Sequence, residues 1–578
     1  MMVRPTSLLA ALVAPLLAAA LPAAPAAPAA SFGHYEPRPS FDGIQSRSFY
    51  VRLRDGVRIA VRVDRPTLNG KAYEGRLPVI WHHTLSISQL VQDGAGGRIS
   101  AFQNMPSLTR FGYVVVQVAR RGNGQSFGSM RGYHDRNEAQ DAFELIDWLS
   151  KQPWSDGKVG MYGCSNTGDA AMHALTMRPP ALKAVFAGCF SWHKYDAFRR
   201  GGIFAQWGTG PTRSIAEDMK VSPVDGDESK ALLAQAAAEH QASTPLFEMW
   251  KQLPYRDSFS PLVGSRFWSE SSAASYADQI RLSGIPLYIA GGWRDELRDQ
   301  GMIAHLNVPG SKIIIGPWRH CDTENFAFLE EMQRFFDRYL KGIRTGVDQD
   351  APIHYYTVNA PAGHEWRSAT AWPLPGTQTQ TWYLAGGLLA AHAADAAPAR
   401  FETRTDIACP DAGSGARVQP CHVSGYGASF AGPALPKPVE VTGNPIMTTW
   451  IASSGRDANV FAYLEDVAPD GSIHVVTEGR LKASLRKEDK APWAMPAGVP
   501  WHRAYAEDAQ PLTPDVPVAL HFDMMPTSYV FLPGHRIQVT ITGSDHRERA
   551  RDGGAPKITV LGDRAHASAI ALPVIPAS

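Results

Sequence analysis

Two patterns of apolar and polar positions divide the chain at about residue 350. Before that point, short apolar runs alternate with segments whose apolar positions recur at helical spacing. The apolar runs are LPVIWHH, YVVVQVARRG, KVGMYG, ALKAVFAGC, IPLYIAGGW and SKIIIGPW, and the helical segments are NEAQDAFELIDWLSKQ, SNTGDAAMHALTM and LEEMQRFFDRYLKG. Apolar strands that alternate with helices predict a mostly parallel sheet covered by helices on both faces.

This strand–helix rhythm follows a predicted hairpin and is interrupted once. RSFYVRLRDGVRIAVRVD alternates apolar and polar positions on both sides of Asp55-Gly56, which is typical of a β-hairpin. Residues 190–283 contain tryptophans, glycines and helix-like segments such as ESKALLAQAAAEHQAS. We therefore predict an α/β core made of residues 31–189 and 284–350, with a helical cap, residues 190–283, inserted between the two parts.

The last part of the chain has the second pattern of apolar and polar positions. Short alternating segments such as TQTWYLAG, ANVFAYLEDV and HRIQVTITGS are separated by turn residues. That pattern predicts antiparallel strands with one buried face. Residues 351–578 are therefore predicted to form an all-β domain, a jelly-roll β-sandwich.

The first thirty residues differ from all of these. Arg4 precedes the apolar run LLAALVAPLLAAAL, and PAAPAAPAASFG then offers small-residue cleavage sites. This predicts a secretory signal peptide over residues 1–30, with an uncleaved anchor as the alternative. No later segment has eighteen uninterrupted apolar residues, so we expect a mature protein that is exported, periplasmic or secreted, and not held in a membrane.

Composition narrows the choice of partners. The 578 residues include 56 Lys and Arg against 55 Asp and Glu, which gives a net charge of +1 without long runs of either sign. Such a balance argues against nucleic acid or an acidic membrane surface as a partner. The length also exceeds what one hydrophobic core usually serves, in agreement with several domains.

The predicted export bears on whether the five cysteines form disulfides. Cys409 and Cys421 flank the loop PDAGSGARVQP, and in an oxidising compartment we expect them to form a disulfide, with two free thiols as the alternative. Cys164, Cys189 and Cys321 lie in apolar or motif contexts and are expected to be small packing residues. The absence of CxxC or a similar spacing argues against a zinc site.

The segment KVGMYGCSNTGDAAMHAL places Ser165 between a predicted strand and a predicted helix. A nucleophilic serine is often held on such a tight turn, where glycines such as Gly163 and Gly168 avoid steric clashes. The text G-C-S-N-T-G is not the usual G-x-S-x-G form, so the motif alone is weak. The alternative is that Ser165 is only a small residue at the start of a helix.

A serine nucleophile needs a base and an acid that orients the base, and both follow later strands. Asp295 comes just after IPLYIAGGW, and His320 comes just after SKIIIGPW. The order Ser165, Asp295, His320 is the one found in α/β-hydrolases. Taken singly, Asp295 is more often a helix N-cap and His320 a loop histidine, but their joint placement at strand ends argues against coincidence.

These pieces together resemble the family of serine hydrolases that contains cocaine esterase and X-prolyl dipeptidyl-peptidases, along with α-amino-acid ester hydrolases and glutaryl-cephalosporin acylases. The resemblance implies an α/β-hydrolase core with a helical cap and a C-terminal jelly roll, and no cofactor or metal. It also implies Ser165 as nucleophile, His320 as base and Asp295 as orienting acid. The matching segments are QPWSDGKVGMYGCSNTG, IAGGWRD, IIIGPWRH, HEWRSATAWPLPG and FLPGHRIQVTITGSDH.

One departure from the family concerns the oxyanion hole. Family members usually carry a tyrosine whose hydroxyl binds the oxyanion beside the N–H of the residue after the nucleophile, here Asn166. In this sequence Ser86 stands at the tyrosine's position, and His82, His83 and Ser86 are the candidate substitutes. Ile87 follows where amino-acid ester hydrolases carry an acid, which argues against a preference for a free α-amino group.

The histidine pair and the aromatic residues of the cap each allow two interpretations. His82 and His83 point to opposite faces of a strand, which argues against a shared metal ion. In the cap, Trp192 and Trp207 are candidate walls of an apolar substrate pocket. The alternative is that these and other cap aromatics form the core of the cap.

The sequence therefore predicts an exported serine hydrolase that cleaves a small-molecule ester or amide through an acyl-enzyme. X-prolyl dipeptidyl-peptidase or β-lactam acylase activity is the alternative within this class. A rival of another class is a binding protein that has little or no catalytic activity and uses the jelly roll. The natural substrate and the oligomeric state stay open.

Overall fold

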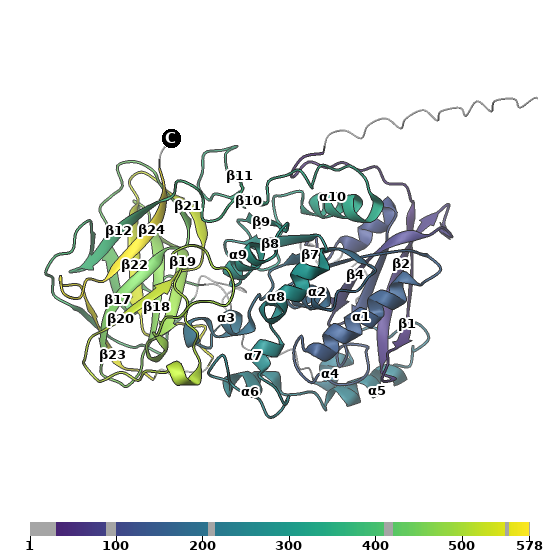
Figure 1. Cartoon of the computed structure of the whole chain (residues 1–578), viewed down its shortest axis with the longest axis horizontal. Helices are drawn as coiled ribbons and strands as arrows, with labels where there is room; N and C mark the ends of the chain where they lie inside the picture. The colour runs from purple at the N-terminus through teal and green to yellow at the C-terminus, as the bar shows by residue number, and fades with distance from the viewer. Residues whose placement is uncertain (1–29, 88–99, 206–213, 410–419, 550–553, 577–578) are drawn as a thin grey trace, which may run out of the picture.

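The computed structural model describes residues 30–87, 100–205, 214–409, 420–549 and 554–576, in an α/β domain and an all-β domain that lie side by side (Figure 1). The predicted signal peptide, residues 1–30, lies almost entirely outside the described residues. Among the helices in the described segments, none is long and apolar enough to cross a membrane.

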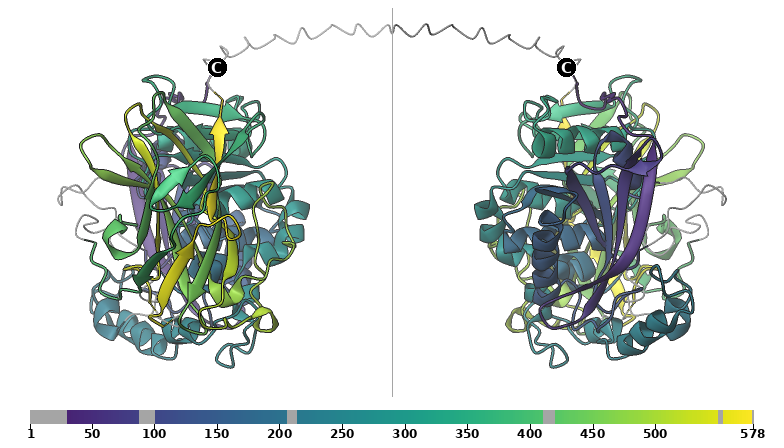
Figure 2. Two further views of the ribbon diagram at one scale, coloured as in Figure 1. Left: turned by 90° about the vertical axis from the view of Figure 1, so that its left-hand side faces the viewer. Right: turned by 90° about the vertical axis from the view of Figure 1, so that its right-hand side faces the viewer.

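The first sheet has the strand order β1-β2-β5-β4-β6-β7-β8-β9-β10-β11, with β3 beside β2. It is parallel from β5 to β10 and antiparallel at both edges. Its strands are β1 Gly43–Arg52, β2 Arg58–Leu68, β3 Lys71–Ala72, β4 Leu77–Thr84, β5 Val114–Ala119, β6 Ser155–Cys164, β7 Leu182–Gly188, β8 Leu287–Gly292, β9 Lys312–Gly316, β10 Ile353–Tyr356 and β11 Trp366–Ala369. The purple hairpin β1–β2 forms the edge that is far from the all-β domain (Figures 1 and 2). The predicted hairpin and parallel sheet are confirmed.

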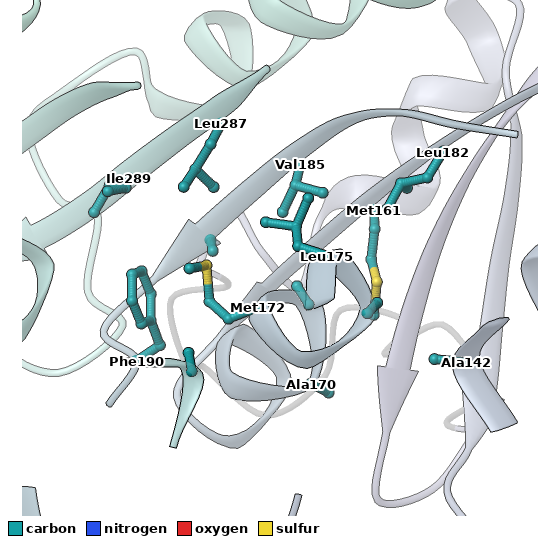
Figure 3. Packing of buried hydrophobic residues seen from close by; sticks show 14 of the residues in the cluster. Ala142, Met161, Ala170, Met172, Leu175, Leu182, Val185, Phe190, Leu287 and Ile289 are labelled. Carbon is teal, nitrogen blue, oxygen red and sulfur yellow. The ribbon is translucent and has the colours of Figure 1, made fainter. Parts of the chain in front are cut away.

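Helices cover both faces of this sheet, as the apolar runs predict. Ile313 and Ile315 of β9 pack into one core cluster, and Ile314 between them packs into the cluster on the other face. On the first face, Figure 3 shows β-strand residues such as Met161 and Val185 near the α2 residues. The helices on this face are α1 Arg136–Ser150, α2 Asn166–Met177 and α9 Arg298–Asn307; on the other lie η1 Met105–Phe111 and α10 Phe328–Lys341.

The inserted segment between β7 and β8 is helical, which confirms the predicted cap. Its aromatic residues Phe198, Trp250, Phe267 and Trp268 pack against one another in a buried cluster. Its elements are α3 Lys194–Phe198, η2 Arg200–Gly202, α4 Ile215–Asp218, α5 Ala231–His240, α6 Leu246–Lys251, α7 Phe267–Glu270, η3 Ala273–Tyr276 and α8 Ala277–Ser283.

The C-terminal domain is all-β, as predicted, and almost all its strand pairs are antiparallel. Its own apolar core lies between its strands. The strands are β12 Gln378–Ala385, β13 Leu388–Ala390, β14 Ala399–Glu402, β15 Ala428–Ala431, β16 Val439–Gly443, β17 Ile446–Ser453, β18 Asn459–Val467, β19 Ile473–Lys482, β20 Val518–Asp523, β21 Thr527–Phe531, β22 Arg536–Thr542, β23 Lys557–Leu561 and β24 Ala569–Ile575; short 3-10 turns are η5 Ser424–Tyr426, η6 Ala483–Leu485 and η7 Ala506–Asp508.

The first sheet extends past the predicted boundary at residue 350. Strand β10 pairs in parallel with β9, and β11 pairs with β10, so both belong to the α/β sheet. The all-β strands begin only at β12. The sequence did not reveal this pairing because β10 and β11 are short and carry polar residues, so their pattern resembles the half-buried strands that follow.

Candidate active site

Ser165 occupies a sharp turn between β6 and α2. Its backbone has φ 61° and ψ −130°, a conformation that non-glycine residues rarely adopt and that costs about 1–3 kcal/mol. Hydrogen bonds hold it there: the Ser165 N–H donates to the Gly188 carbonyl at 3.0 Å, and the Asp169 N–H donates to the Ser165 carbonyl at 2.9 Å. The turn therefore has the strained strand-to-helix form that a nucleophilic serine requires.

The two glycines of the motif are required by close backbone contacts. A Cβ on Gly163 would lie 2.2 Å from the Thr167 carbonyl oxygen, and a Cβ on Gly168 would lie 2.4 Å from the Gly188 carbonyl oxygen. Both distances are far below van der Waals contact with rigid backbone. The turn and the packing of α2 on the sheet thus depend on glycine at both positions.

His320 and Asp295 lie together at the carboxyl ends of β9 and β8. His320 Nδ1 is 3.1 Å from Asp295 Oδ1, and Asp295 is buried. The two loops are joined by backbone bonds, since the Arg294 N–H donates to the Trp318 carbonyl at 3.0 Å. Helix α9 begins at Arg298 after an N-cap at Leu297, so Asp295 is not its N-cap.

A second acid that the sequence analysis missed also contacts His320. Glu296 Oε1 lies 3.3 Å from His320 Nδ1, and Glu296 is buried. Burial raises the pKa of Glu296 to about 7, with the Asp295 charge adding to the rise and His320 opposing it. The only sequence signal was a second carboxyl directly after Asp295 in GGWRDE.

The two acids set the charge of the histidine. Burial alone would lower the pKa of His320, but the carboxylates of Glu296 and Asp295 outweigh it and raise the pKa to about 10. Burial alone would raise the pKa of Asp295, but His320 and the Cys189 thiol hold it below its ordinary value. The pair therefore favours an imidazolium beside a carboxylate, the charge distribution of a triad after proton transfer.

The residues that flank Ser165 and His320 are bonded to each other. Cys164 and Cys321 form a disulfide with a Cα–Cα distance of 5.9 Å. The expectation that both are packing residues is wrong, because strand ends 157 residues apart in the chain converge at one edge of the sheet. Cys189 is a buried free thiol, as expected for a packing residue. The predicted bond between Cys409 and Cys421 is present.

Asn166, which is predicted to supply the oxyanion N–H, is the first residue of α2. Its side-chain Oδ1 accepts a hydrogen bond from Arg120 at 3.2 Å, and His134 Nε2 lies 2.7 Å from its carbonyl oxygen. Arg120 is fully buried and pairs with Glu138 at 2.9 Å. Arg120 was also missed, and it fixes the residue whose N–H was predicted to bind the oxyanion.

The candidates for a second oxyanion donor lie near the end of β4. The His82 ring stacks on Tyr162 at 4.7 Å, whereas the buried His83 ring lies 5.2 Å from Trp81, so the two histidines belong to opposite faces. Burial, aided by Arg120, holds the pKa of His83 well below its ordinary value, so its ring is neutral. Ser86 packs against Gly124, and a second donor from Ser86 or His83 stays a prediction.

The prediction that Trp192 and Trp207 line a substrate pocket is not confirmed for either residue. Trp192 is fully buried in the core cluster of the α/β domain, so it lines no open pocket and is not part of the aromatic cluster of the cap either. Trp207 lies outside the described residues.

Three groups of side chains have the compactness of a metal site. Cys189, Asp295 and His320 place one ligand atom each within 4.8 Å of one another, but burial raises the pKa of the Cys189 thiol well above its ordinary value and keeps it protonated. The other two groups contain cysteines that are bonded as disulfides and therefore offer no thiolate.

A strained serine turn, with an acid–histidine pair at the ends of later parallel strands, defines the α/β-hydrolase class. Two family models then match in order: the X-Pro dipeptidyl-peptidase (S15 family) over residues 55–322 and the X-Pro dipeptidyl-peptidase C-terminal non-catalytic domain over residues 345–570. The chain belongs to this family of hydrolases, which extends to cocaine esterase and the CocE/NonD hydrolases.

Relatives and solved structures agree with the assignment. A protein of Mycobacterium bovis named "Putative serine esterase" is 32% identical, over 93% of this chain and 96% of its own length. The cocaine esterase of a Rhodococcus species is 26% identical, over 86% and 90%. Among solved structures, a CocE/NonD family hydrolase from Staphylococcus aureus has a TM-score of 0.70 at 18% identity, covering 92% of this chain and 94% of its own. An α-amino acid ester hydrolase has a TM-score of 0.68 at 20% identity, over 94% and 98%.

Proposed function

We propose that the protein hydrolyses small-molecule carboxylic esters through Ser165, His320 and Asp295. The observation that carries this proposal is the His320–Asp295 pair at 3.1 Å on a loop bonded directly to the strained Ser165 turn. Residues adjacent to the base and to the nucleophile are joined covalently. This link supports a common site for Ser165, His320 and Asp295, the three side chains that acyl transfer needs.

In this mechanism His320 accepts the proton of the Ser165 hydroxyl while its oxygen attacks the ester carbonyl. The Asn166 N–H stabilises the oxyanion, and the tetrahedral intermediate collapses when the alcohol leaves with the proton from His320. Water, deprotonated by His320, then attacks the acyl-enzyme and releases the acid and Ser165. Asp295 holds the imidazole orientation and balances its charge throughout.

We propose esters, and not X-prolyl peptides, as substrates because the relatives of higher sequence identity are named as esterases. The relatives at 32% and 26% identity carry esterase names, whereas those named for Xaa-Pro dipeptidyl-peptidase activity are 22–24% identical. The replacement of the family's oxyanion tyrosine by Ser86 also favours esters. An activated ester is hydrolysed more easily than an amide, so it tolerates the loss of one hydrogen-bond donor in the oxyanion hole better. Amide cleavage is the second candidate.

Export is part of the proposal. The N-terminal sequence has the composition of a signal peptide, and two disulfides in one chain suit an oxidising compartment. Expression of the full chain followed by N-terminal sequencing of the mature protein tests it. A product that starts between residues 22 and 33 supports export, and an intact N-terminus in the cytoplasm overturns it.

The catalytic proposal is tested by labelling with a fluorophosphonate and by turnover of p-nitrophenyl acetate, p-nitrophenyl butyrate and glycyl-prolyl-p-nitroanilide. We expect label and ester turnover in the wild type and in Ser472→Ala, a matched change at an exposed serine, and neither in Ser165→Ala. Equal labelling of Ser165→Ala removes Ser165 from the mechanism. Absence of label and turnover in the wild type favours the binding-protein alternative.

A further inference from the structure

We infer that the Cys164–Cys321 disulfide is a positioning device that holds His320 against the Ser165 turn, so that turnover depends on the redox state of this bond. The inference rests on the proposed function and adds two positioning residues and a redox dependence to it. Cys164 directly precedes Ser165, and Cys321 directly follows His320. The bond therefore joins the nucleophile turn to the base through one residue on each side.

The sheet by itself does not hold these two loops together. Strands β6 and β9, which lead to Ser165 and His320, are separated by β7 and β8. Three strand spacings amount to roughly 14 Å. The Cα atoms of Cys164 and Cys321 are nevertheless only 5.9 Å apart, so the histidine loop reaches across the ends of two strands.

The loop that carries His320 has no regular secondary structure of its own. Between the end of β9 at Gly316 and the start of α10 at Phe328, the chain has no helix or strand. The loop's non-covalent ties to the rest of the domain include the bond from the Arg294 N–H to the Trp318 carbonyl at 3.0 Å, the bond from the Ala101 N–H to the Thr323 hydroxyl at 3.1 Å and the histidine–acid pair. The disulfide is the one covalent tie between this described loop and β6.

Cys189 completes the arrangement as a third sulfur. Its Sγ, with those of Cys164 and Cys321, lies in a group whose atoms are within 4.8 Å of one another, and it accepts the Cys321 N–H at 3.4 Å. Exchange would need the Cys189 thiolate to attack the Cys321 sulfur, which forms a Cys189–Cys321 bond and releases the Cys164 thiolate. Burial and the nearby Asp295 raise the pKa of the Cys189 thiol, so it stays protonated and the Cys164–Cys321 pairing persists.

A small dithiol breaks the bond without any other reactant. Two successive exchanges leave Cys164 and Cys321 as thiols and the dithiol as its cyclic disulfide. His320 is then held only by non-covalent contacts. Because misplacement of a catalytic group by about 1 Å costs up to about a hundredfold in rate, we expect kcat to fall by that order while KM changes little.

The experiment measures p-nitrophenyl butyrate turnover by the folded enzyme before reduction with dithiothreitol, after it and after reoxidation, with circular dichroism as the check on folding. We expect kcat to fall on reduction and to recover on reoxidation. The double variant Cys164→Ala/Cys321→Ala is expected to have the low kcat from the start and no response to the dithiol. Its acid-limb midpoint of kcat/KM should also move toward the ordinary histidine value, because His320 leaves its acids.

The matched control is Cys409→Ala/Cys421→Ala, which removes the other disulfide and is expected to keep both full activity and full sensitivity to the dithiol. Unchanged kcat in the reduced, folded wild type would overturn the inference, as would wild-type kcat in the double variant. If the double variant does not fold, the reduced wild type still decides. Failure of the proposed function looks different, because then the oxidised enzyme has no ester turnover at all.

A separate observation leads to a second site. We also infer that a pocket between the α/β domain and the all-β domain binds an oxyanion group, a carboxylate or a phosphate. The pocket has a volume of about 230 Å³, and its lining includes Arg294, Arg298, Arg319, His422 and His474. None of the described residues that line it is acidic, so the lining carries three positive charges even with both histidines neutral.

The three arginines of the lining differ in burial and in their contacts. Buried Arg298 donates to the Trp293 carbonyl and, at 3.1 Å, to the Thr477 hydroxyl, and the charge of Glu478 acts on it. Arg294 and Arg319 are exposed and supply the charge that solvent reaches. The carboxylate of Asp466, near His474, already accepts from the Tyr529 hydroxyl at 2.8 Å and contacts His535 at 2.8 Å. Guanidinium groups pair with planar oxyanions through two parallel hydrogen bonds, so an anion is the ligand that suits this lining.

Isothermal titration calorimetry of the full chain with sodium phosphate, sodium citrate and sodium chloride at equal ionic strength tests this site. We expect saturable binding of phosphate or citrate, and not of chloride, that weakens about tenfold or more in Arg319→Ala. Arg564→Ala, at an exposed arginine of the all-β domain, is the control and should bind as the wild type does. Phosphate without citrate identifies a phosphate site, and citrate without phosphate a carboxylate site. Equal heats for all three salts, or equal binding by Arg319→Ala, overturn the inference.

Discussion

The Nδ1 atom of His320 lies 3.3 Å from Oε1 of Glu296, almost as close as it lies to Asp295. One imidazole thus faces two buried carboxyl groups that are neighbours in the chain. Since both acids stabilise the imidazolium, the pH at which His320 can act as a base is set by Glu296 as well as by Asp295.

The first prediction concerns pH. A base acts only when it is neutral, so kcat/KM should rise with pH through the pKa of His320. That pKa is raised, so we expect an acid-limb midpoint above the ordinary 6.5. Glu296→Gln removes one of the charges that raise it, so the midpoint should move down. A pH profile of p-nitrophenyl butyrate hydrolysis measures this, with exposed Glu330→Gln as the control. A midpoint that Glu296→Gln leaves in place would contradict a role for Glu296.

The second prediction separates the two acids. Asp295→Asn should lower kcat by roughly a thousand- to ten-thousandfold, because the histidine loses its orienting carboxylate. Glu296→Gln should change kcat much less, because its oxygen makes no hydrogen bond with Nδ1 of the kind that Asp295 makes. Kinetics of both single variants and of the double variant measure the coupling. Equal losses in the two single variants would mean that the acids share the orienting role.

The third prediction concerns the turn glycines. Gly163→Ala should destabilise the α/β domain by about 1–3 kcal/mol, because its Cβ meets the Thr167 carbonyl oxygen at 2.2 Å. Activity should fall with it, since the change displaces the start of α2. The control is Gly291→Ala, where the nearest atom to a new Cβ is 4.0 Å away. Urea unfolding followed by tryptophan fluorescence compares them, and equal midpoints would refute the steric argument.

The fourth prediction concerns the stability of the two disulfides. In the chain-entropy account, a bond across 157 residues stabilises by roughly 5 kcal/mol and one across 12 residues by about 3 kcal/mol. Removal of Cys164–Cys321 should therefore lower the thermal midpoint more than removal of Cys409–Cys421. Differential scanning calorimetry of the two double alanine variants measures both. A larger loss for the short loop would show that local strain outweighs loop length.

Local pattern determined much of this protein. The strand KIIIG buries every residue because helices cover both faces of the sheet, and that apolar continuity is visible in the sequence. Asp295 and His320 could be found because the carboxyl ends of parallel strands meet at one edge, so residues just after strands are brought together. Ser165 could be found because a strand, two glycines and a helix must surround such a turn.

Tertiary structure alone decided the rest. Cys164 and Cys321 pair because their loops lean over the ends of two intervening strands, a distance in space that no local pattern encodes. Glu296 joins the site because the loop after β8 turns both of its carboxyl groups toward one imidazole. Strands β10 and β11 belong to the first sheet because β9 leaves an edge for them to pair with, although their own sequence resembles the domain that follows. The hydrophobic periodicity and composition of a segment indicate its secondary structure and its burial. The residues that it contacts depend on how the whole chain packs.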